Sequence, residues 1–258
     1  MARVRTSRSL AVAGLTGLAV AFLSGCSGGP STTRSASSPP GFGSSSPGTS
    51  ATAPSKLEDA SADEILARAR TALLAARTVH ARGAVRNGGT AYTLDLRLVR
   101  GVGATGSVAS EGRDLGVLRI GKVAYVLLDA ATWKAATGSD AAARTFAGKY
   151  LKVTDASSAA FQPFLALTDV QRAYGSALAP TGVLTKGSVT TVQGRRVIDL
   201  EIDGGASGDV YVTLDGTPYP VRLAYGPGAA QYVDFDQFGA KVVLAAPPAS
   251  KVVTVPAS

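Results

Sequence analysis

One histidine is the first residue to consider for chemistry, because the 258-residue sequence contains His80 and no other imidazole. A general base needs a nucleophile within reach. The sequence has no GxSxG, no SxxK with its companion motifs and no HExxH. We therefore interpret His80 as a structural, hydrogen-bonding side chain, and the sequence predicts a protein that is not an enzyme.

Alternating carboxylates are the second candidate site. One segment alternates acidic with aliphatic side chains, namely Asp199, Glu201 and Asp203 with Ile198, Leu200 and Ile202. A strand there would place the three carboxylates on one face, and Asp234 and Asp236 repeat the pattern. Carboxylate oxygens can bind a cation, but the same alternation is typical of any strand with one face in water. We expect neither a metal site nor a cofactor.

A glycine-rich stretch, GVGATG at residues 101–106, matches the GxGxxG pattern of dinucleotide-binding folds. In those folds the pattern opens a helix. Here it continues through SVAS to another glycine, Gly112, and a further expected strand. We interpret the stretch as a glycine-rich hairpin.

The single cysteine, Cys26, can form no internal disulfide, and one histidine is too few to complete a zinc site with it. Before it lie three arginines (Arg3, Arg5, Arg8) and an apolar run over residues 10–23, which is shorter than the ~20 residues that span a bilayer. The residues LSGC at 23–26 resemble a bacterial lipobox. This resemblance implies a lipoprotein signal peptide at residues 1–25 and a palmitate-type anchor on Cys26, at the outer face of the cytoplasmic membrane. The alternative is a free thiol at an ordinary cleavage site.

Charge argues against a nucleic-acid partner. Three of the 26 basic residues lie in the expected signal peptide, so 23 remain against 18 acidic ones. They are scattered, apart from Arg195-Arg196, and no basic stripe is interleaved with aromatic residues. We expect no nucleic acid as partner, and contact with the membrane through the anchor.

Composition divides the rest of the chain in two. Residues 26–60 consist largely of Ser, Thr, Pro, Gly and Ala, so they bury too little apolar surface to offset the entropy of ordering. We interpret them as a disordered tether, whose root-mean-square span would be roughly 30 Å. Residues 61–258 are long enough for one domain with a sizeable core.

The domain begins with a capping box at Ser61 and Glu64, followed by apolar residues at helical spacing: Ile65, Leu66, Ala69, Leu73, Ala76 and Val79. The period then changes to two, which places Tyr92, Leu94, Leu96 and Leu98 on one face of a strand. Further strands are expected around residues 115–120, 122–128, 189–192, 196–203, 209–214, 221–225, 231–236 and 241–244, and two or three short helices within 130–177. The fold class is α+β, a long antiparallel meander with helices on one face.

The order of these features resembles a known family. The lipobox, the tether and the capped helix are followed by RTVH at 77–80, GKVAYV at 121–126, ATW at 131–133, YPVR at 219–222, FDQFG at 235–239 and APP at 246–248. Together they are similar to the LppX/LprA/LprF/LprG family of mycobacterial-type lipoproteins. The resemblance implies a LolA-like half-barrel whose concave face is covered by helices over an apolar cavity. It also implies a carrier that binds acylated lipid or glycolipid and takes it through the cell envelope, where a lipid exporter is a fitting partner.

Three functions stay open at this level. The first is the carrier; the second is a protein-interaction or lipid-sensing module of the MucB/RseB type on the same scaffold. The third and least favoured is an enzyme, which would need at least a cleft that holds His80 with a carboxylate in reach. For a cavity, the sequence favours Leu94, Leu96, Leu98, Leu118, Ile120, Tyr125, Phe161, Phe164, Leu165, Ile198 and Leu200 as lining residues. Periodicity alone leaves a hollow wall and a solid core equally possible.

Overall fold

The computed structural model describes residues 56–87, 90–110, 112–154, 161, 165–226 and 230–254. Cys26, the expected signal peptide and most of the expected tether lie outside these residues. The last residues of the expected tether are folded, because Leu57–Asp59 form a 3-10 helix, η1. Lys186 Nζ donates to the carbonyls of Glu58 and Ala60, at 2.8 and 3.2 Å. The folded part therefore includes residues 56–60, before the expected boundary at 61.

Helix α1 (Ala62–Ala75) begins as the capping box predicts. The Ser61 hydroxyl accepts a hydrogen bond from the Glu64 backbone N–H at 3.2 Å. The apolar stripe is buried, and Ile65 and Leu73 have no exposed surface. The helix ends at Ala75, so Val79, which its spacing placed on the helix, belongs to the first strand instead. A run of β-branched residues, Thr78-Val79, favours that change of structure.

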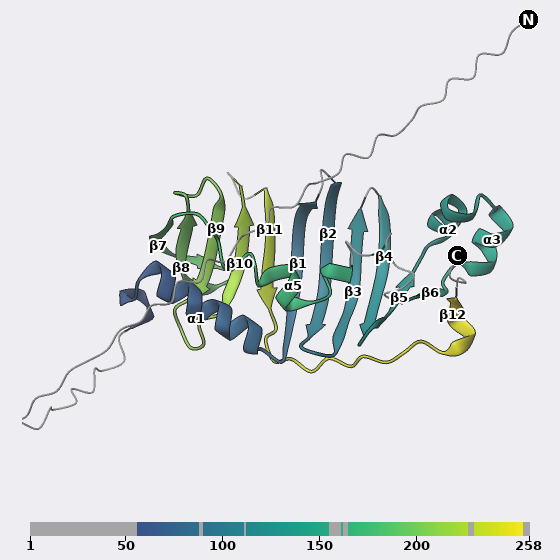
Figure 1. Ribbon diagram of the computed structural model, residues 1–258, viewed down its shortest axis with the longest axis horizontal. Helices are drawn as coiled ribbons and strands as arrows, with labels where there is room; N and C mark the ends of the chain where they lie inside the picture. Colours follow the sequence, from purple (N-terminus) through teal and green to yellow (C-terminus); the bar gives the residue numbers. More distant parts are fainter. Residues whose placement is uncertain are drawn as a thin grey trace, which may run out of the picture. The chain divides into compact units, whose positions relative to one another are not determined.

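Twelve strands in the described ranges form one open sheet (Figure 1). They are β1 (Thr78–Asn87), β2 (Thr90–Val99), β3 (Gly103–Ser110), β4 (Arg113–Ile120), β5 (Val123–Leu127), β6 (Tyr150–Thr154), β7 (Leu184–Val192), β8 (Arg195–Ile202), β9 (Gly208–Thr213), β10 (Pro220–Tyr225), β11 (Gln231–Asp236) and β12 (Val252–Thr254). Their order is β12-β6-β5-β4-β3-β2-β1-β11-β10-β9-β8-β7. All pairs are antiparallel except β12 with β6. The α+β meander is confirmed.

Two consecutive meanders make up this sheet, β1 to β6 and β7 to β11, and they join where β1 pairs with β11. The expected strand at 241–244 is wrong. After β11 the chain runs along the strand ends (yellow in Figure 1), passes the short 3-10 helix η5 (Ala249–Lys251) and adds β12 at the far edge. Its apolar alternation arises without a neighbouring strand.

The glycine-rich stretch forms the β2–β3 hairpin, as expected, and not a nucleotide-binding turn. Gly106 shows why glycine is needed there. Its φ is 147°, and a Cβ at this position would lie 2.0 Å from the Asp95 carbonyl oxygen of the neighbouring strand. Adjacent backbones approach too closely for any side chain.

The region 130–177 contains three described helices, α2 (Ala130–Thr137), α3 (Asp140–Phe146) and α5 (Val170–Tyr174), with β6 between α3 and α5. Within the described residues, none of the helices has the length and apolar character needed to cross a membrane.

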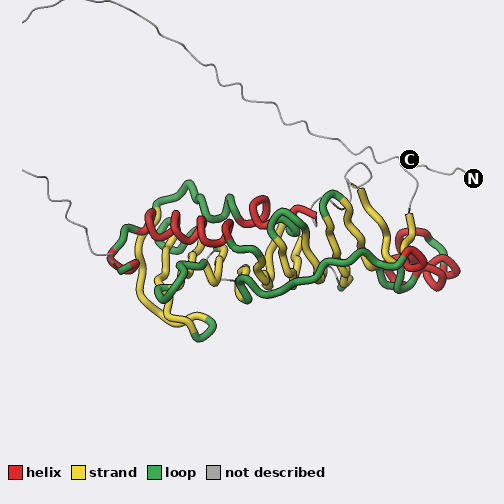
Figure 2. Tube along the Cα trace, turned by 90° about the horizontal axis from the view of Figure 1, so that it is seen from below, coloured by secondary structure: helices red, strands yellow, loops and turns green. Residues whose placement is uncertain are grey.

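The sheet has two unlike faces. We call the face that carries Leu96, Val117 and Phe235 the helix face, since α1 packs against it (Figure 2). Residues that lie directly opposite one another on paired strands project from the same face of the sheet. Leu96 lies opposite Gly106 and Ala81, and Gly106 lies opposite Val117, so these residues share the helix face. The opposite, open face carries alternate residues such as His80 and Arg222.

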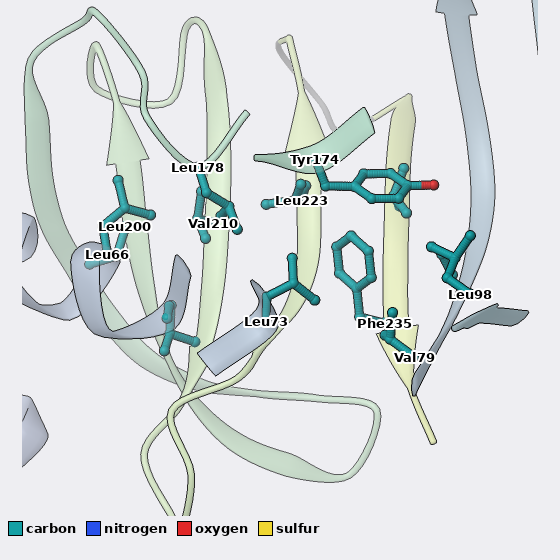
Figure 3. Packing of buried hydrophobic residues seen from close by; sticks show 14 of the residues in the cluster. Leu66, Leu73, Val79, Leu98, Tyr174, Leu178, Leu200, Val210, Leu223 and Phe235 are labelled. Atoms are coloured by element: carbon teal, nitrogen blue, oxygen red, sulfur yellow. The ribbon is translucent and has the colours of Figure 1, made fainter. Parts of the chain in front are cut away.

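One large cluster fills the space between α1 and the strands of the helix face. Leu73 of α1 lies beside Phe235 and Leu223 (Figure 3), and all three are at most 2% exposed. Tyr174 of α5 packs edge-on against Phe235, with ring centroids 5.0 Å apart at 85°. A separate cluster lies at β4 to β6, where Leu115, Val126 and Leu151 meet α2 and α3 through Trp133 and Ala143.

Candidate functional site

A cavity of about 620 Å³ lies on the helix face, between the β2–β4 ends and α2. Its apolar walls come from Tyr92, Leu115, Leu128, Trp133, Leu151 and Phe161. Tyr92, Leu115 and Leu151 come from the helix face of the alternate strands β2, β4 and β6, and Trp133 closes the cavity from α2. The volume is within the range of ~300–1,000 Å³ that small-molecule sites usually have.

Helix α2 places the tryptophan. The Asp129 carboxylate caps the helix by accepting from the Thr132 backbone N–H at 2.7 Å, and Gly138 ends it in the left-handed conformation at φ 67°. Trp133, 4% exposed, packs on Phe146 of α3 with ring centroids 5.1 Å apart. The indole N–H has no hydrogen-bond partner among the described residues.

Two of the polar side chains that line the cavity are hydrogen-bonded to backbone carbonyl groups. Ser110 Oγ donates to the Ala91 carbonyl at 3.0 Å, and Thr137 Oγ1 donates to the Trp133 carbonyl at 2.8 Å. Arg113 is the charged residue in the lining. The walls are thus mainly hydrocarbon and aromatic, with polar groups of β3, β4 and α2 among them.

Five of the eleven residues expected to line a cavity belong to the packed cluster under α1, and one of them, Leu98, also borders a second, smaller pocket. Leu94, Leu96 and Leu98 are at most 2% exposed and belong to the cluster under α1, together with Ile198 and Leu200. They share the helix face, as their alternation predicts. None of them lines the cavity beneath α2.

The expectation that Leu118, Ile120 and Tyr125 share a cavity with Leu96 is wrong, because these three residues lie on the open face. Leu118 lies opposite Tyr125 on β5 and opposite Thr105 on β3. Thr105 lies opposite Arg97 on β2, and Arg97 lies opposite His80, which is on the open face. Strand β4 presents Val117 and Leu118 in succession, both apolar, and a shift of one residue turns every side chain to the other face. These three residues cannot share a cavity with Leu96.

Phe161 does line the cavity, and Leu165 is buried in the adjacent cluster. Phe164 lies outside the described residues. The lining residues that sequence reasoning missed are Tyr92, Leu115, Leu128, Trp133 and Leu151. Tyr92 carried a usable signal, since it continues the Leu94 alternation.

His80 lies on the open face at the junction of the two meanders. Its Nδ1 is 2.7 Å from Asp236 Oδ1 on β11, and its Nε2 is 3.0 Å from Asp95 Oδ1 on β2. Both ring nitrogens therefore face carboxylates, and no hydroxyl or thiol of the described residues is hydrogen-bonded to the ring. The imidazole thus connects β1 with β2 and β11, in agreement with the interpretation of His80 as a hydrogen-bonding side chain.

The alternating carboxylates only partly share a face. Asp199 and Glu201 lie on the open face of β8, near Asp209 on β9. The pKa of Asp199 is raised to about 6, mainly because the carboxyl group is buried. The negative charges of Asp209 and Glu201 add to this increase. Asp203 instead lies after β8 in a turn at φ 54°, where it accepts from Ser207 Oγ and the Val183 N–H at 2.6 and 2.9 Å.

The second pair of alternating carboxylates, Asp234 and Asp236, forms ion pairs. Asp234 receives two hydrogen bonds from the Arg222 guanidinium, at 2.6 and 3.0 Å, and these raise the pKa of Arg222. Asp236 contacts His80 and lies 3.8 Å from Arg82. Across the described residues, no group of three or more His, Cys, Asp or Glu side chains is placed to hold a metal ion.

No protein-family model matches the sequence, and no curated protein is similar enough to indicate a relative. Among solved structures, LprF from Mycobacterium bovis is 15% identical, with a TM-score of 0.50, over 72% of this chain and 96% of that one. The Mycobacterium tuberculosis lipoprotein LppX is 12% identical, with a TM-score of 0.45, over 71% and 98%. MucB in complex with MucA(peri) is 16% identical, with a TM-score of 0.36, over 75% and 62%. At such identities a likeness concerns the fold, and the described part of this chain has the fold of LprF: an open antiparallel sheet with helices on one face.

Proposed function

We propose that this protein binds the acyl chains of a lipid or glycolipid in the cavity under α2 and carries that lipid through the cell envelope. In the same proposal, Cys26 holds the protein at the outer face of the cytoplasmic membrane, and residues 26–55 serve as the tether. The observation that carries the proposal is the 620 Å³ cavity with a mainly apolar lining.

Physical chemistry favours a hydrocarbon ligand. Tyr92, Leu115 and Trp133 offer apolar surface in the cavity, and each methylene moved from water into such a site contributes about 0.8 kcal/mol. The lipid chain gains this energy only where the wall is not already packed. The cluster under α1 is packed, and this supports the α2 end of the sheet as the proposed site.

The sensor module would be favoured by a solid core and one exposed apolar patch. Among the described residues, the large hydrophobic side chains that are exposed are Val102, Val183, Val189 and Val243. They belong to the β2–β3 turn, the β7 edge and the segment before β12, and scattered exposed valines are ordinary. The cavity and the scattered valines both support the carrier.

Filling the cavity from α2 tests the proposal. Ala135 and Ala136 are both exposed on α2, and Ala136 lines the cavity whereas Ala135 does not. Ala136→Phe should place a ring in the cavity and reduce uptake of a fluorescent acyl lipid by delipidated protein. Ala135→Phe is the matched control, because both changes carry the same helix-propensity cost of about 0.5 kcal/mol.

Uptake by wild type and by Ala135→Phe, with loss in Ala136→Phe, is the expected pattern. A wild type that binds no acyl lipid after delipidation would overturn the proposal. Equal uptake by all three proteins would move the site away from α2. Transfer between donor and acceptor vesicles then tests the carrier step, which a pure sensor would not perform.

A further inference from the structure

A second pocket lies on the helix face at the opposite ends of β2, β3 and β4. Its volume is about 320 Å³, and it is bounded by the β2–β3 turn, the β4–β5 turn and the segment that leads into α5. Leu74, Leu98 and Val170 supply apolar surface, while Arg100 and Arg119 supply positive charge. The cavity under α2 is lined from the other ends of these strands, by Thr90, Ser110 and Arg113.

Arg119 is held in a fixed orientation. It comes from the helix face of β4, opposite Ala104, and is half-buried. Its Nε donates to the Gly121 carbonyl at 3.0 Å and its Nη1 to Thr168 Oγ1 at 3.2 Å. Thr168 is itself buried and donates to the Leu165 carbonyl at 2.6 Å. A long side chain fixed in this way has lost its rotamer freedom before any ligand arrives.

No acidic side chain of the described residues neutralises the charge of Arg119. Within the described residues, no carboxylate forms an ion pair with Arg119 or with Arg100. Asp169, which also lines the pocket, accepts from the N–H groups of Gln171 and Arg172 at 2.9 and 3.0 Å. A half-buried guanidinium without a counterion is unfavourable, and a bound anion would relieve this cost.

Arg100 adds a second guanidinium to the same pocket. Its Nη1 donates to the Leu74 carbonyl at 3.3 Å, and the rest of the side chain is exposed. Gly103 permits the close approach of β3 to β4 at this point, because a Cβ there would lie 1.9 Å from the Arg119 carbonyl oxygen. The glycine-rich hairpin thus brings the two arginines to one pocket.

We infer that this pocket is an anion site that takes a phosphate group, bound by Arg119 and Arg100. The Nη2 group of Arg119 and the outer N–H groups of Arg100 are the donors for the phosphate oxygens. Guanidinium groups suit phosphate because their N–H groups can donate in parallel pairs. The phosphate belongs either to a lipid headgroup or to a free phosphate ester. The site does not depend on the acyl-chain cavity.

The soluble arm of the test uses glycerol phosphate and calorimetry on the Cys26→Ala form of the full chain. Arg100→Gln, an exposed change that leaves folding intact, and Arg119→Gln should each weaken binding about tenfold or more, the usual effect of losing a charged hydrogen bond. Arg70→Gln on α1 changes the net charge equally outside the pocket and should bind like wild type. Arg119→Lys keeps the charge but cannot make both hydrogen bonds, to Gly121 and Thr168, that fix the guanidinium, so it should bind more weakly than wild type.

The membrane arm measures sedimentation of the same proteins with phosphatidylcholine vesicles, with and without phosphatidylglycerol. Sedimentation that requires phosphatidylglycerol and is lost in Arg100→Gln assigns the phosphate to a lipid headgroup. Glycerol phosphate binding without sedimentation assigns it to a free ester. The inference is overturned if neither probe binds, or if Arg70→Gln weakens binding as much as Arg100→Gln. Acyl-lipid uptake by wild type reports on the proposed function separately.

Discussion

Replacing a leucine with tryptophan at two positions of the helix face should have opposite consequences. Leu96 lies in the cluster under α1 with no exposed surface, whereas Leu115 lines the cavity under α2. Both residues belong to strands of one sheet and project from the same face. The pair therefore compares packed core with hollow wall in a single protein.

The magnitude follows from the surroundings of each residue. At Leu96 the larger ring has no space, and overpacking of this kind costs about 1–3 kcal/mol. In a domain of this length, 1 kcal/mol lowers Tm by roughly 2–4 °C, so Leu96→Trp should lower Tm by about 2–12 °C. At Leu115 the indole can enter the 620 Å³ cavity, and we expect Tm to fall by less than about 2 °C.

Thermal unfolding and lipid uptake must both be measured on delipidated protein, because bound lipid raises stability by mass action. Leu115→Trp should reduce uptake of a fluorescent acyl lipid, since the ring occupies volume that a chain would fill. Leu96→Trp should leave uptake near that of wild type at temperatures where it is folded. The reasoning would be refuted by equal destabilisation at both positions, which would mean that the α2 end is packed as well.

Three further predictions test other parts of the chain. The pKa of Asp199 in the folded protein is about 6, above the ordinary 3.8, so the contribution of this carboxyl to stability falls as pH rises from about 4 through 6. Asp199→Asn should therefore raise Tm at pH 7.5 and change Tm little at pH 4. An equal change in Tm at both pH values would contradict the burial argument. Gly106→Ala should cost at least about 2 kcal/mol in urea unfolding, and more than Gly112→Ala, where nothing lies within 4 Å of the added Cβ. Cys26→Ala should move the protein out of the membrane fraction with loss of the lipid mass, and its retention there would remove the lipobox hypothesis.

Local signals in the sequence predicted much of the fold. The capping box, the buried stripe of α1 and the alternation of Leu94, Leu96 and Leu98 each depend on neighbours a few residues away. The prediction of a strand at 241–244 was wrong because the apolar alternation there is typical of a strand, whereas strand pairing depends on which backbone lies beside the segment.

The site was harder to predict than the fold. Periodicity assigns a side chain to a face, but the width of the gap above that face depends on where the covering helices pack. Leu96 and Leu115 look alike in sequence, yet α1 and α5 fill the space over one and α2 leaves space over the other. At Val117-Leu118 even the face was ambiguous, because both residues are apolar.

The seam between β1 and β11 has a consequence for how this sheet assembles. Every other antiparallel pair joins strands that follow one another along the chain, so each meander can form from local contacts. The seam joins residues such as His80 and Asp236, which are 156 positions apart, and contacts of that range form slowly. Until β11 arrives, β1 presents ten residues of unpaired backbone, an edge that other chains can join. The closing of the seam therefore also protects the folding chain from aggregation.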